Sequence, residues 1–238
     1  AVVGGLNAHY WSTNDYALFN NLFVLPGVSD KPLSLYLINT LFSFSSKPSI
    51  GFPNQVALIP YRRCKFKTLT KFRRLTFSLH HILHTSLITR LRFNDTLYSF
   101  ISRVRNSSYV SEHTPLPSQL FFHQRYIHNL NDRNYYSIVC QESDNSQAIA
   151  LVSHYYPANK LHILYFDYTD IHSALSVLSN ACQYAQTQNL VVDCVFNISL
   201  ESELLDHLSI HSSTDPIIGK HTNSIENYII RDGDNDVY

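Results

Sequence analysis

Several features that mark common protein classes are missing from this sequence of 238 residues. It contains no run of about 18 apolar residues, which a membrane-spanning helix requires, and its start lacks the basic-then-apolar order of a secretory signal peptide. These absences predict a cytoplasmic protein with no membrane partner. With 45% hydrophobic and 15% charged residues, the chain has enough apolar material for one large or two modest globular domains.

Cysteine is scarce and methionine is absent. The four cysteines stand singly, with neither CxxC spacing nor the density of a disulfide scaffold, so we expect free, mostly buried thiols. The chain begins with alanine and has no methionine, so a removed initiator, a processed product and a fragment all remain open.

Acidic residues are missing from one long segment. No Asp or Glu occurs between Lys31 and Arg92, although that segment is rich in lysine and arginine. Such asymmetry often marks a surface that meets a phosphate, a nucleotide or a nucleic acid. A solvated face whose partner charges come from the rest of the fold is the open alternative.

The N-terminal part of the chain predicts alternating strands and helices. Apolar periodicity and turn residues indicate, in order, two strands, a helix, a short strand, a second helix and a further pair of strands, over residues 1–26, 32–42, 48–52, 54–63 and 66–83.

The C-terminal part repeats this order after a loop at residues 107–119. It predicts three strands, a helix, a strand, a short helix and a last strand, over residues 135–141, 147–156, 160–168, 171–188, 190–197, 201–211 and 223–232. The predicted fold is α/β, with a mixed sheet flanked by helices. The repetition indicates two related units, residues 1–92 and 93–238.

Two stretches of the first unit resemble the acetyl-CoA-dependent N-acetyltransferase superfamily, commonly called the GNAT fold. In VLPGVSDKPLSLYL, Val24 and Pro26 match the V-x-P pattern that ends a strand before a phosphate-binding loop. In GFPNQVALIPYRRCKF, Asn54, Ala57 and Tyr61 match an N-x-x-A pattern followed by a tyrosine. The resemblance implies an enzyme that transfers an acyl group from acetyl-CoA to an amine acceptor, either a small molecule or a protein.

The resemblance also implies where acetyl-CoA binds. In the family the pantetheine arm lies between two splayed parallel strands and the diphosphate lies at the start of the following helix. The residues of this sequence at those two places are Phe23, Val24 and Leu25 on the strand, and Lys31, Leu33 and Ser34 at the loop and helix.

Asn54 and Tyr61 would act on the reacting end of the cofactor. The resemblance implies that the Asn54 side chain reaches the pantetheine amides and that Tyr61 is the general acid. A tyrosine hydroxyl, with an unperturbed pKa of about 10, is suited to protonate a departing thiolate. The open alternative is structural, with Asn54 as a helix N-cap and Tyr61 as a half-buried aromatic residue.

The first unit departs from the family pattern in two ways. The loop carries Asp30 and Pro32 where the family has glycines that let backbone N–H groups approach the diphosphate. Only 26 residues precede Gly27, so the unit is short at its N-terminal side. We expect that the family's acceptor wall is missing or supplied elsewhere, either because the chain is a fragment or because the unit has lost its acceptor pocket. Weak CoA binding, a different ligand and no ligand all remain open.

The second unit carries a weaker resemblance over residues 119–235. Arg125 and Tyr126, followed by a strand that begins near Tyr136, are similar to a stretch of some tandem GNAT-like proteins. No phosphate-binding loop is visible in it. We therefore expect a second, non-catalytic GNAT-like domain.

A binding protein is the alternative to an enzyme. The basic segment 62–74 would then meet a polyanion or a protein partner. The same segment interleaves basic and aromatic residues as single-strand binders do, but a sheet with one solvated face shows this alternation too, so no nucleic-acid partner is predicted. The sequence does not indicate an oligomeric state.

No metal site is predicted. His80 and His84 have the i, i+4 spacing of zinc ligands, but no glutamate accompanies them in an HExxH pattern. The aspartates within residues 232–236 imitate the opening of a calcium loop, and the closing glutamate is missing.

Overall fold

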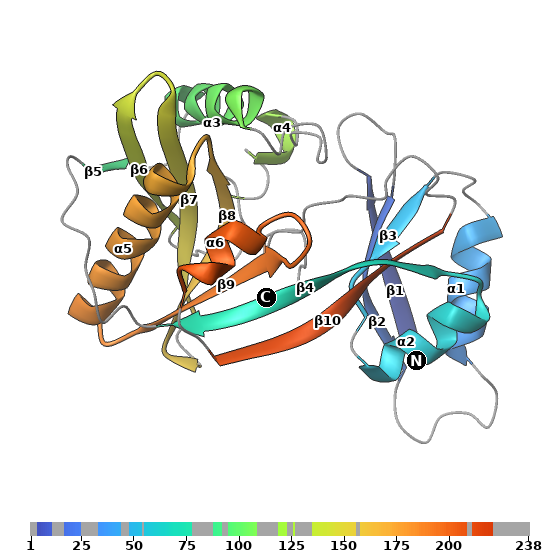
Figure 1. The fold of residues 1–238 in the computed structure, drawn as a ribbon. Helices are drawn as coiled ribbons and strands as arrows, with labels where there is room; N and C mark the ends of the chain where they lie inside the picture. Colours follow the sequence, from blue (N-terminus) through green and yellow to red (C-terminus); the bar gives the residue numbers. More distant parts are fainter. Residues whose placement is uncertain are drawn as a thin grey trace.

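The computed structural model describes residues 4–10, 17–24, 33–43, 48–53, 55–77, 88–91, 95–108, 119–122, 126, 135–155, 158–208 and 211–220. In this part of the chain, ten strands form one sheet in the order β1-β2-β3-β10-β4-β9-β8-β7-β6-β5 (Figure 1). The predicted α/β fold with a mixed sheet flanked by helices is confirmed.

The strands are β1 (Gly4–Tyr10), β2 (Ala17–Val24), β3 (Ser49–Gly51), β4 (Lys67–Phe77), β5 (Ile88–Leu91), β6 (Tyr135–Ser143), β7 (Ser146–Tyr155), β8 (Lys160–Tyr168), β9 (Val191–Asn197) and β10 (His211–Lys220). The helices are α1 (Leu33–Ser43), α2 (Gln55–Arg63), α3 (Asp95–Ser107), α4 (Gln119–Phe122), α5 (Ile171–Thr187) and α6 (Ser202–Asp206).

The elements fall into two groups along the sheet. We use "first half" for β1 to β4 with α1 and α2, and "second half" for β5 to β10 with α3 to α6. In Figure 1, α1 and α2 lie beside the strands at one end of the sheet, and the other helices surround β6 to β9. The division into domains at residue 92 stays a prediction.

Two long strands join the halves, because each of them pairs with strands of the other half. Strand β10 of the second half lies between β3 and β4 of the first half, and β4 lies between β10 and β9. The two strands are antiparallel over almost their whole lengths, from the pair of His211 and Thr76 to the pair of Gly219 and Lys67. Each half therefore completes its sheet with a strand of the other half.

The hydrophobic clusters follow the same exchange. On one face of the second half, α5 and α6 cover a large cluster that includes Leu75 of β4. On the opposite face, α3 and α4 cover a second cluster, because successive strand residues point to opposite faces. In the first half, Ile38 of α1 and Tyr61 of α2 pack in one cluster with Ile218 of β10. Both halves thus contribute to the cores on each side of the junction.

Several predicted elements are confirmed with small changes at their ends. These are the strands β1, β2, β3 and β6 to β9, and the helices α1, α2 and α5. The four cysteines are free and buried, as expected. The last predicted strand, residues 223–232, and the histidines His80 and His84 lie outside the described residues.

Two predictions about strands are wrong. Residues 67–77 form one long strand rather than part of a strand pair, because β4 is central and pairs with β9 and β10 along its length. Residues 211–220 form β10, although the predicted helix extended to residue 211 and no strand was expected there. Pro216 argues against a central strand, but it lies beside a register shift between Ile217 and Ile218, where proline is tolerated.

Helix α3 was not predicted. Its buried residues Leu97, Ile101 and Val104 have the i, i+4, i+7 spacing of an amphipathic helix, which could have identified it.

Candidate functional site

The first half contains two parallel strands that pair over only three residues. Strands β2 and β3 pair only from Ala17 with Ser49 to Phe19 with Gly51. Strand β2 continues to Val24 and is held there by β1 alone, through the pair of Gly4 and Val24. In the described residues, the backbone of β2 beyond Phe19 therefore has no strand partner on the side of β3. Backbone donors and acceptors that leave a ladder in this way need another partner.

Four of the predicted cofactor residues lie at the end of β2 and the start of α1. Phe23 and Val24 end β2, beyond the last pair with β3. Leu33 begins α1 and Ser34 follows it in the first turn. The described residues of that turn carry no acidic side chain, and the residues just before the helix lie outside the described part.

The remaining predicted cofactor residues cannot be placed. Leu25, Lys31 and Asn54 lie outside the described residues, and their roles stay predictions.

Tyr61 lies on α2 and is buried. Only 3% of its surface is exposed, and its ring packs edge-on against Phe66 with the centroids 5.0 Å apart. Burial, and next the nearby Cys64, raise the pKa of the Tyr61 hydroxyl above its ordinary value. Tyr61 therefore keeps its proton at neutral pH.

A lysine that the sequence analysis missed lies against the hydrophobic cluster that contains Tyr61, Cys64, Phe66 and Phe42, which we call the Tyr61 cluster. Lys220 is the last residue of β10, so the second half brings it to the first half. Its ammonium lies 4.7 Å from the centroid of the Phe42 ring and 5.9 Å from that of Phe66. No local pattern around residue 220 indicates this position, since it depends on a strand exchange.

In the second half, two parallel strands also pair over only part of their lengths. Strands β8 and β9 pair from Lys160 with Val191 to Ile163 with Cys194, and a register shift of β8 against β7 follows at once. Beyond this point β8 continues to Tyr168 and then leads into α5, as β2 leads towards α1.

Aromatic side chains of the two strands meet beyond their last backbone pair. Phe166 of β8 and Phe196 of β9 meet edge-on with their ring centroids 6.1 Å apart. Both rings are almost completely buried, with exposures of 1% and 0%. A ligand chain between these strands would have to displace this contact.

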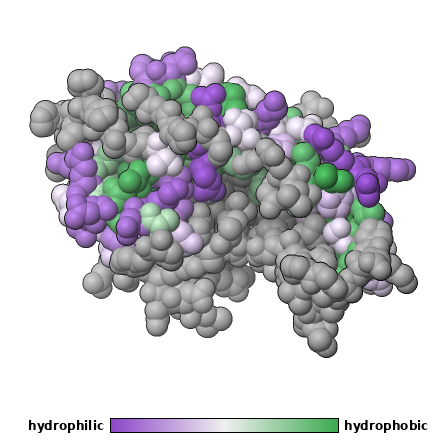
Figure 2. Space-filling view, turned by 90° about the horizontal axis from the view of Figure 1, so that it is seen from below, coloured by the Kyte–Doolittle hydropathy of each residue, from purple (hydrophilic) through white to green (hydrophobic). Residues whose placement is uncertain are grey.

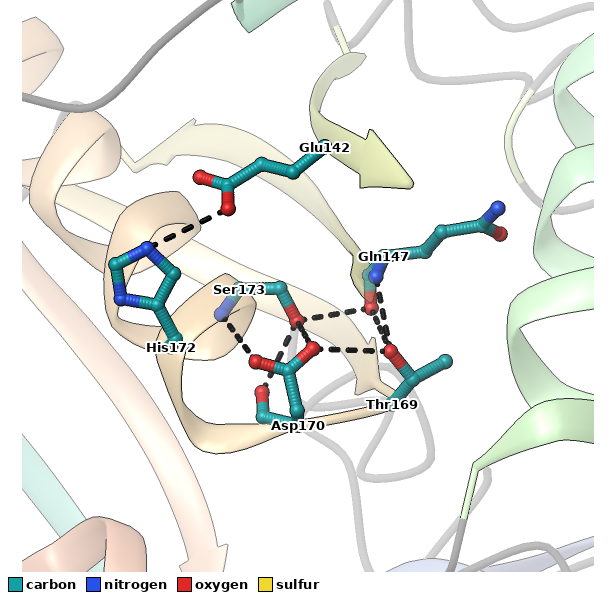
Figure 3. Close-up of polar contacts among 6 residues, drawn as sticks. All are labelled: Glu142, Gln147, Thr169, Asp170, His172 and Ser173. Carbon is teal, nitrogen blue, oxygen red and sulfur yellow. Dashed lines mark hydrogen bonds and ion pairs between the residues drawn. The ribbon is translucent and has the colours of Figure 1, made fainter. Parts of the chain in front are cut away.

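The N-terminus of α5 is likewise occupied (Figure 3). The carboxylate of Asp170 accepts hydrogen bonds from the Ser173 backbone N–H at 2.9 Å and the Ser173 hydroxyl at 2.8 Å. Thr169 donates to the same carboxylate at 3.1 Å. Burial alone would raise the pKa of Asp170, but these hydrogen bonds and one from Ser146 hold it below its usual value. The anion that caps this helix is a side chain of the protein.

In the described residues, helix α6 offers no counterpart of Tyr61. Helix α6, which stands in the same order as α2, has the sequence SELLD and buries Leu204 and Leu205. Before it, the Asn197 side chain accepts hydrogen bonds from the backbone N–H groups of Ser199 and Leu200, so it is used to form a turn. Among the described residues, the tyrosine that the resemblance implies for catalysis lies in the first half, and its role stays a prediction.

A buried carboxylate ties the halves together. Asp193 of β9 is fully buried and accepts from Arg74 at 2.9 Å and from Thr76 at 3.3 Å, both on β4. From β8, His162 lies 3.0 Å away and Lys160 lies 3.8 Å away. Burial alone would raise the pKa of Asp193, but hydrogen bonding to His162 and the positive charge of Arg74 hold it below its usual value.

The basic segment 62–74 does not form one face. Arg62 and Arg63 are exposed at the end of α2, whereas Arg74 belongs to a central strand and pairs with Asp193. The surface seen in Figure 2 shows separate hydrophobic patches among hydrophilic residues. The large apolar side chains that are exposed in the described part of the chain belong to four different elements: Tyr36, Ile59, Tyr136 and Val191.

Two further searches of the described residues found nothing. No three histidine, cysteine or acidic side chains there come together as metal ligands would. None of the helices described is long and apolar enough to cross a membrane.

Solved structures share this fold. A GCN5-related N-acetyltransferase from Kribbella flavida superposes with a TM-score of 0.62 at 12% identity, over 92% of this chain and 56% of that one. One from Anabaena variabilis gives a TM-score of 0.58 at 14% identity, over 94% and 60%. A tandem GNAT protein from the clavulanic acid biosynthesis pathway gives 0.55 at 9% identity, over 92% and 79%. The chain has the GNAT fold.

These similarities concern structure alone. The chain spans less than two thirds of the Kribbella and Anabaena proteins. No protein-family model and no curated protein matches the sequence.

Proposed function

We propose that the protein is an acetyl-CoA-dependent N-acyltransferase whose cofactor binds in the first half, between β2 and β3. The observation that carries this proposal is that β2 extends beyond its last pair with the short parallel strand β3, where it has no strand partner on that side among the described residues, and that a helix follows β2. The second half has the same topology, but its own side chains fill the corresponding places. We therefore assign one cofactor site to the chain.

The residues of the first half suit acetyl-CoA in their donor chemistry. Backbone groups of Phe23, Val24 and Leu25 would bind the pantetheine amides as a neighbouring strand does. The N–H groups of Leu33 and Ser34, at the start of an eleven-residue helix, would bind the diphosphate. Lys31 would add positive charge there, and the Asn54 amide would fix the arm near its thioester end.

Tyr61 would hold the proton that the reaction needs at the sulfur. The bound cofactor supplies a thioester, whose acyl carbon an amine attacks while the carbon–sulfur bond breaks. The Tyr61 hydroxyl would donate its proton to the departing sulfur, and the amine would lose a proton to solvent. A raised pKa keeps this hydroxyl protonated, so the acid is present in the required form at neutral pH.

Substitution of Tyr61 by phenylalanine tests this assignment. The turnover number should fall about a hundredfold or more, as expected for loss of a general acid, with little change in acetyl-CoA affinity. Steady-state acetyl transfer to a panel of amines, together with calorimetric titration, measures both quantities.

Tyr36→Phe is the matched control, because Tyr36 is 66% exposed on α1. It should behave as the wild type. An unchanged turnover number in Tyr61→Phe would remove Tyr61 from the mechanism.

A further inference from the structure

The last residue of strand β10, Lys220, belongs to the second half and lies beside the Tyr61 cluster. Ile218, Gly219 and Lys220 pair with Gly51, Ile50 and Ser49 of β3, the short strand that forms one side of the proposed cofactor site. The same part of β10 pairs with β4 on its other side. The end of β10 is therefore fixed by two ladders.

The side chain of Lys220 contacts two aromatic rings of this cluster. Its ammonium lies over the rings of Phe42, at the end of α1, and Phe66, which follows α2. These two rings meet edge-on with centroids 4.9 Å apart. Phe66 in turn meets the Tyr61 ring edge-on at 5.0 Å. A cation over the faces of two aromatic rings favours one arrangement of those rings. Because the Phe66 ring packs against the Tyr61 ring, this arrangement also restricts the position of Tyr61.

The charge of Lys220 also affects the pKa of a cysteine in the same cluster. Burial raises the pKa of the Cys64 thiol, and the positive charge of Lys220 partly opposes this effect. The described part of the chain contains no carboxylate that forms an ion pair with Lys220, in agreement with the lack of acidic residues from Lys31 to Arg92. The positive charge of Lys220 therefore favours an anion that forms nearby, such as the Cys64 thiolate.

We infer that Lys220 is a positioning residue for Tyr61 and supplies a positive charge beside the Tyr61 cluster. The second half would then contribute a residue to the proposed reaction site of the first half. This inference rests on the proposed function for its catalytic consequence. Its structural content, a lysine of β10 acting on the residues around Tyr61, does not.

The test compares two variants of Lys220 with a control in the full-length protein. Lys220→Gln removes the charge and keeps most of the side-chain length, and Lys220→Arg keeps the charge. Lys71→Gln is the matched control, because Lys71 is an exposed lysine of β4, the strand paired with β10.

The first readout is independent of acetyl transfer. In protein labelled at the cysteine β-carbon, NMR follows ionisation of Cys64, whose signal is identified by its loss in Cys64→Ser. The titration midpoint of Cys64 should move to higher pH in Lys220→Gln and stay unchanged in Lys71→Gln, and Lys220→Arg should restore it. An unmoved midpoint in Lys220→Gln would overturn the inference.

The second readout is the division between turnover and binding. In Lys220→Gln, kcat should fall about ten- to a hundredfold, as for a misplaced catalytic group, while KM for acetyl-CoA stays the same. A shifted Cys64 titration with unchanged kcat would contradict the positioning role. A wild-type protein that transfers no acetyl group to any amine would instead overturn the proposed function. The Cys64 titration would still decide whether Lys220 acts on the Tyr61 cluster.

Discussion

Asp193 shows how one side chain can join two parts of a sheet. Its carboxylate receives groups from β4 of the first half and from β8 of the second half, and none of its surface is exposed. A buried carboxylate with several donors is stable only as long as each donor remains.

Substitution of Asp193 by asparagine should strongly destabilise the protein. The amide leaves the positive charges of Arg74 and Lys160 without their partner, which costs about 3–5 kcal/mol when one member of a buried pair is lost. Urea denaturation at neutral pH measures this change in the free energy of unfolding. Asp206→Asn, at an exposed position on α6, is the control and should unfold like the wild type.

The same pair of variants predicts a pH dependence. Because the pKa of Asp193 is lowered in the folded state, its stabilisation is complete above the unfolded value of about 3.9 and is lost as the pH falls through the folded value. Stability measured from neutral pH downwards should therefore drop less steeply in Asp193→Asn than in the wild type. Equal slopes in the two proteins would show that Asp193 does not contribute.

The sequence indicates Tyr61 but not Lys220 as a candidate site residue, and the difference has a physical cause. Tyr61 follows Asn54 by seven residues, about two helical turns, so a local pattern indicates it. Lys220 lies beside the Tyr61 cluster only because β10 pairs with β3 and β4 of the first half. Its role depends on contacts between residues far apart in the sequence, which local patterns do not carry.

At the scale of elements, helix α5 shows why the second half is proposed to be non-catalytic. Its N-terminal N–H groups are where an anion would bind, and Asp170 already supplies a carboxylate there. The corresponding residues before α1 lie outside the described part.

Substitution of Asp170 by alanine should lower the stability of the protein by about 1 kcal/mol, the usual cost of losing an N-cap side chain. Thermal denaturation followed by circular dichroism measures the change. Asp144→Ala, in the exposed turn between β6 and β7, is the control. A variant as stable as this control would show that the Asp170 contacts contribute nothing.

Elements with a strong local signal were predictable, and elements defined by their neighbours were not. The alternating and helical patterns of β6 to β9 and α5 identified them from sequence. Strand β10 was missed because Pro216 and several polar residues obscure its pattern, and it is stabilised by pairing with β3 and β4. The loop of the first half differs from the family pattern, and its residues 25–32 lie outside the described part.

At the scale of the molecule, the exchange of strands makes the halves depend on each other. Strand β3 has three residues and pairs with β2 and β10, and the core on each side of the junction contains residues of both halves. A short strand and a shared core have little stability without their partners.

We expect one cooperative unfolding transition for the whole chain. Residues 1–92 and 93–238, expressed separately, should each fail to give such a transition, and mixing the two should restore it. Thermal melts by circular dichroism and the dispersion of amide signals in NMR spectra measure this. A cooperative transition of residues 1–92 alone would contradict the account of the exchanged strands.

The most direct test of the central claim is calorimetric titration of the protein with acetyl-CoA. If the cofactor site lies in the first half and the second half is filled by its own side chains, binding should saturate at one acetyl-CoA per chain. Asn54→Ala should abolish it, whereas Asn145→Ala, in an exposed turn of the second half, should not. Two sites per chain, no binding, or binding that persists in Asn54→Ala would contradict the account.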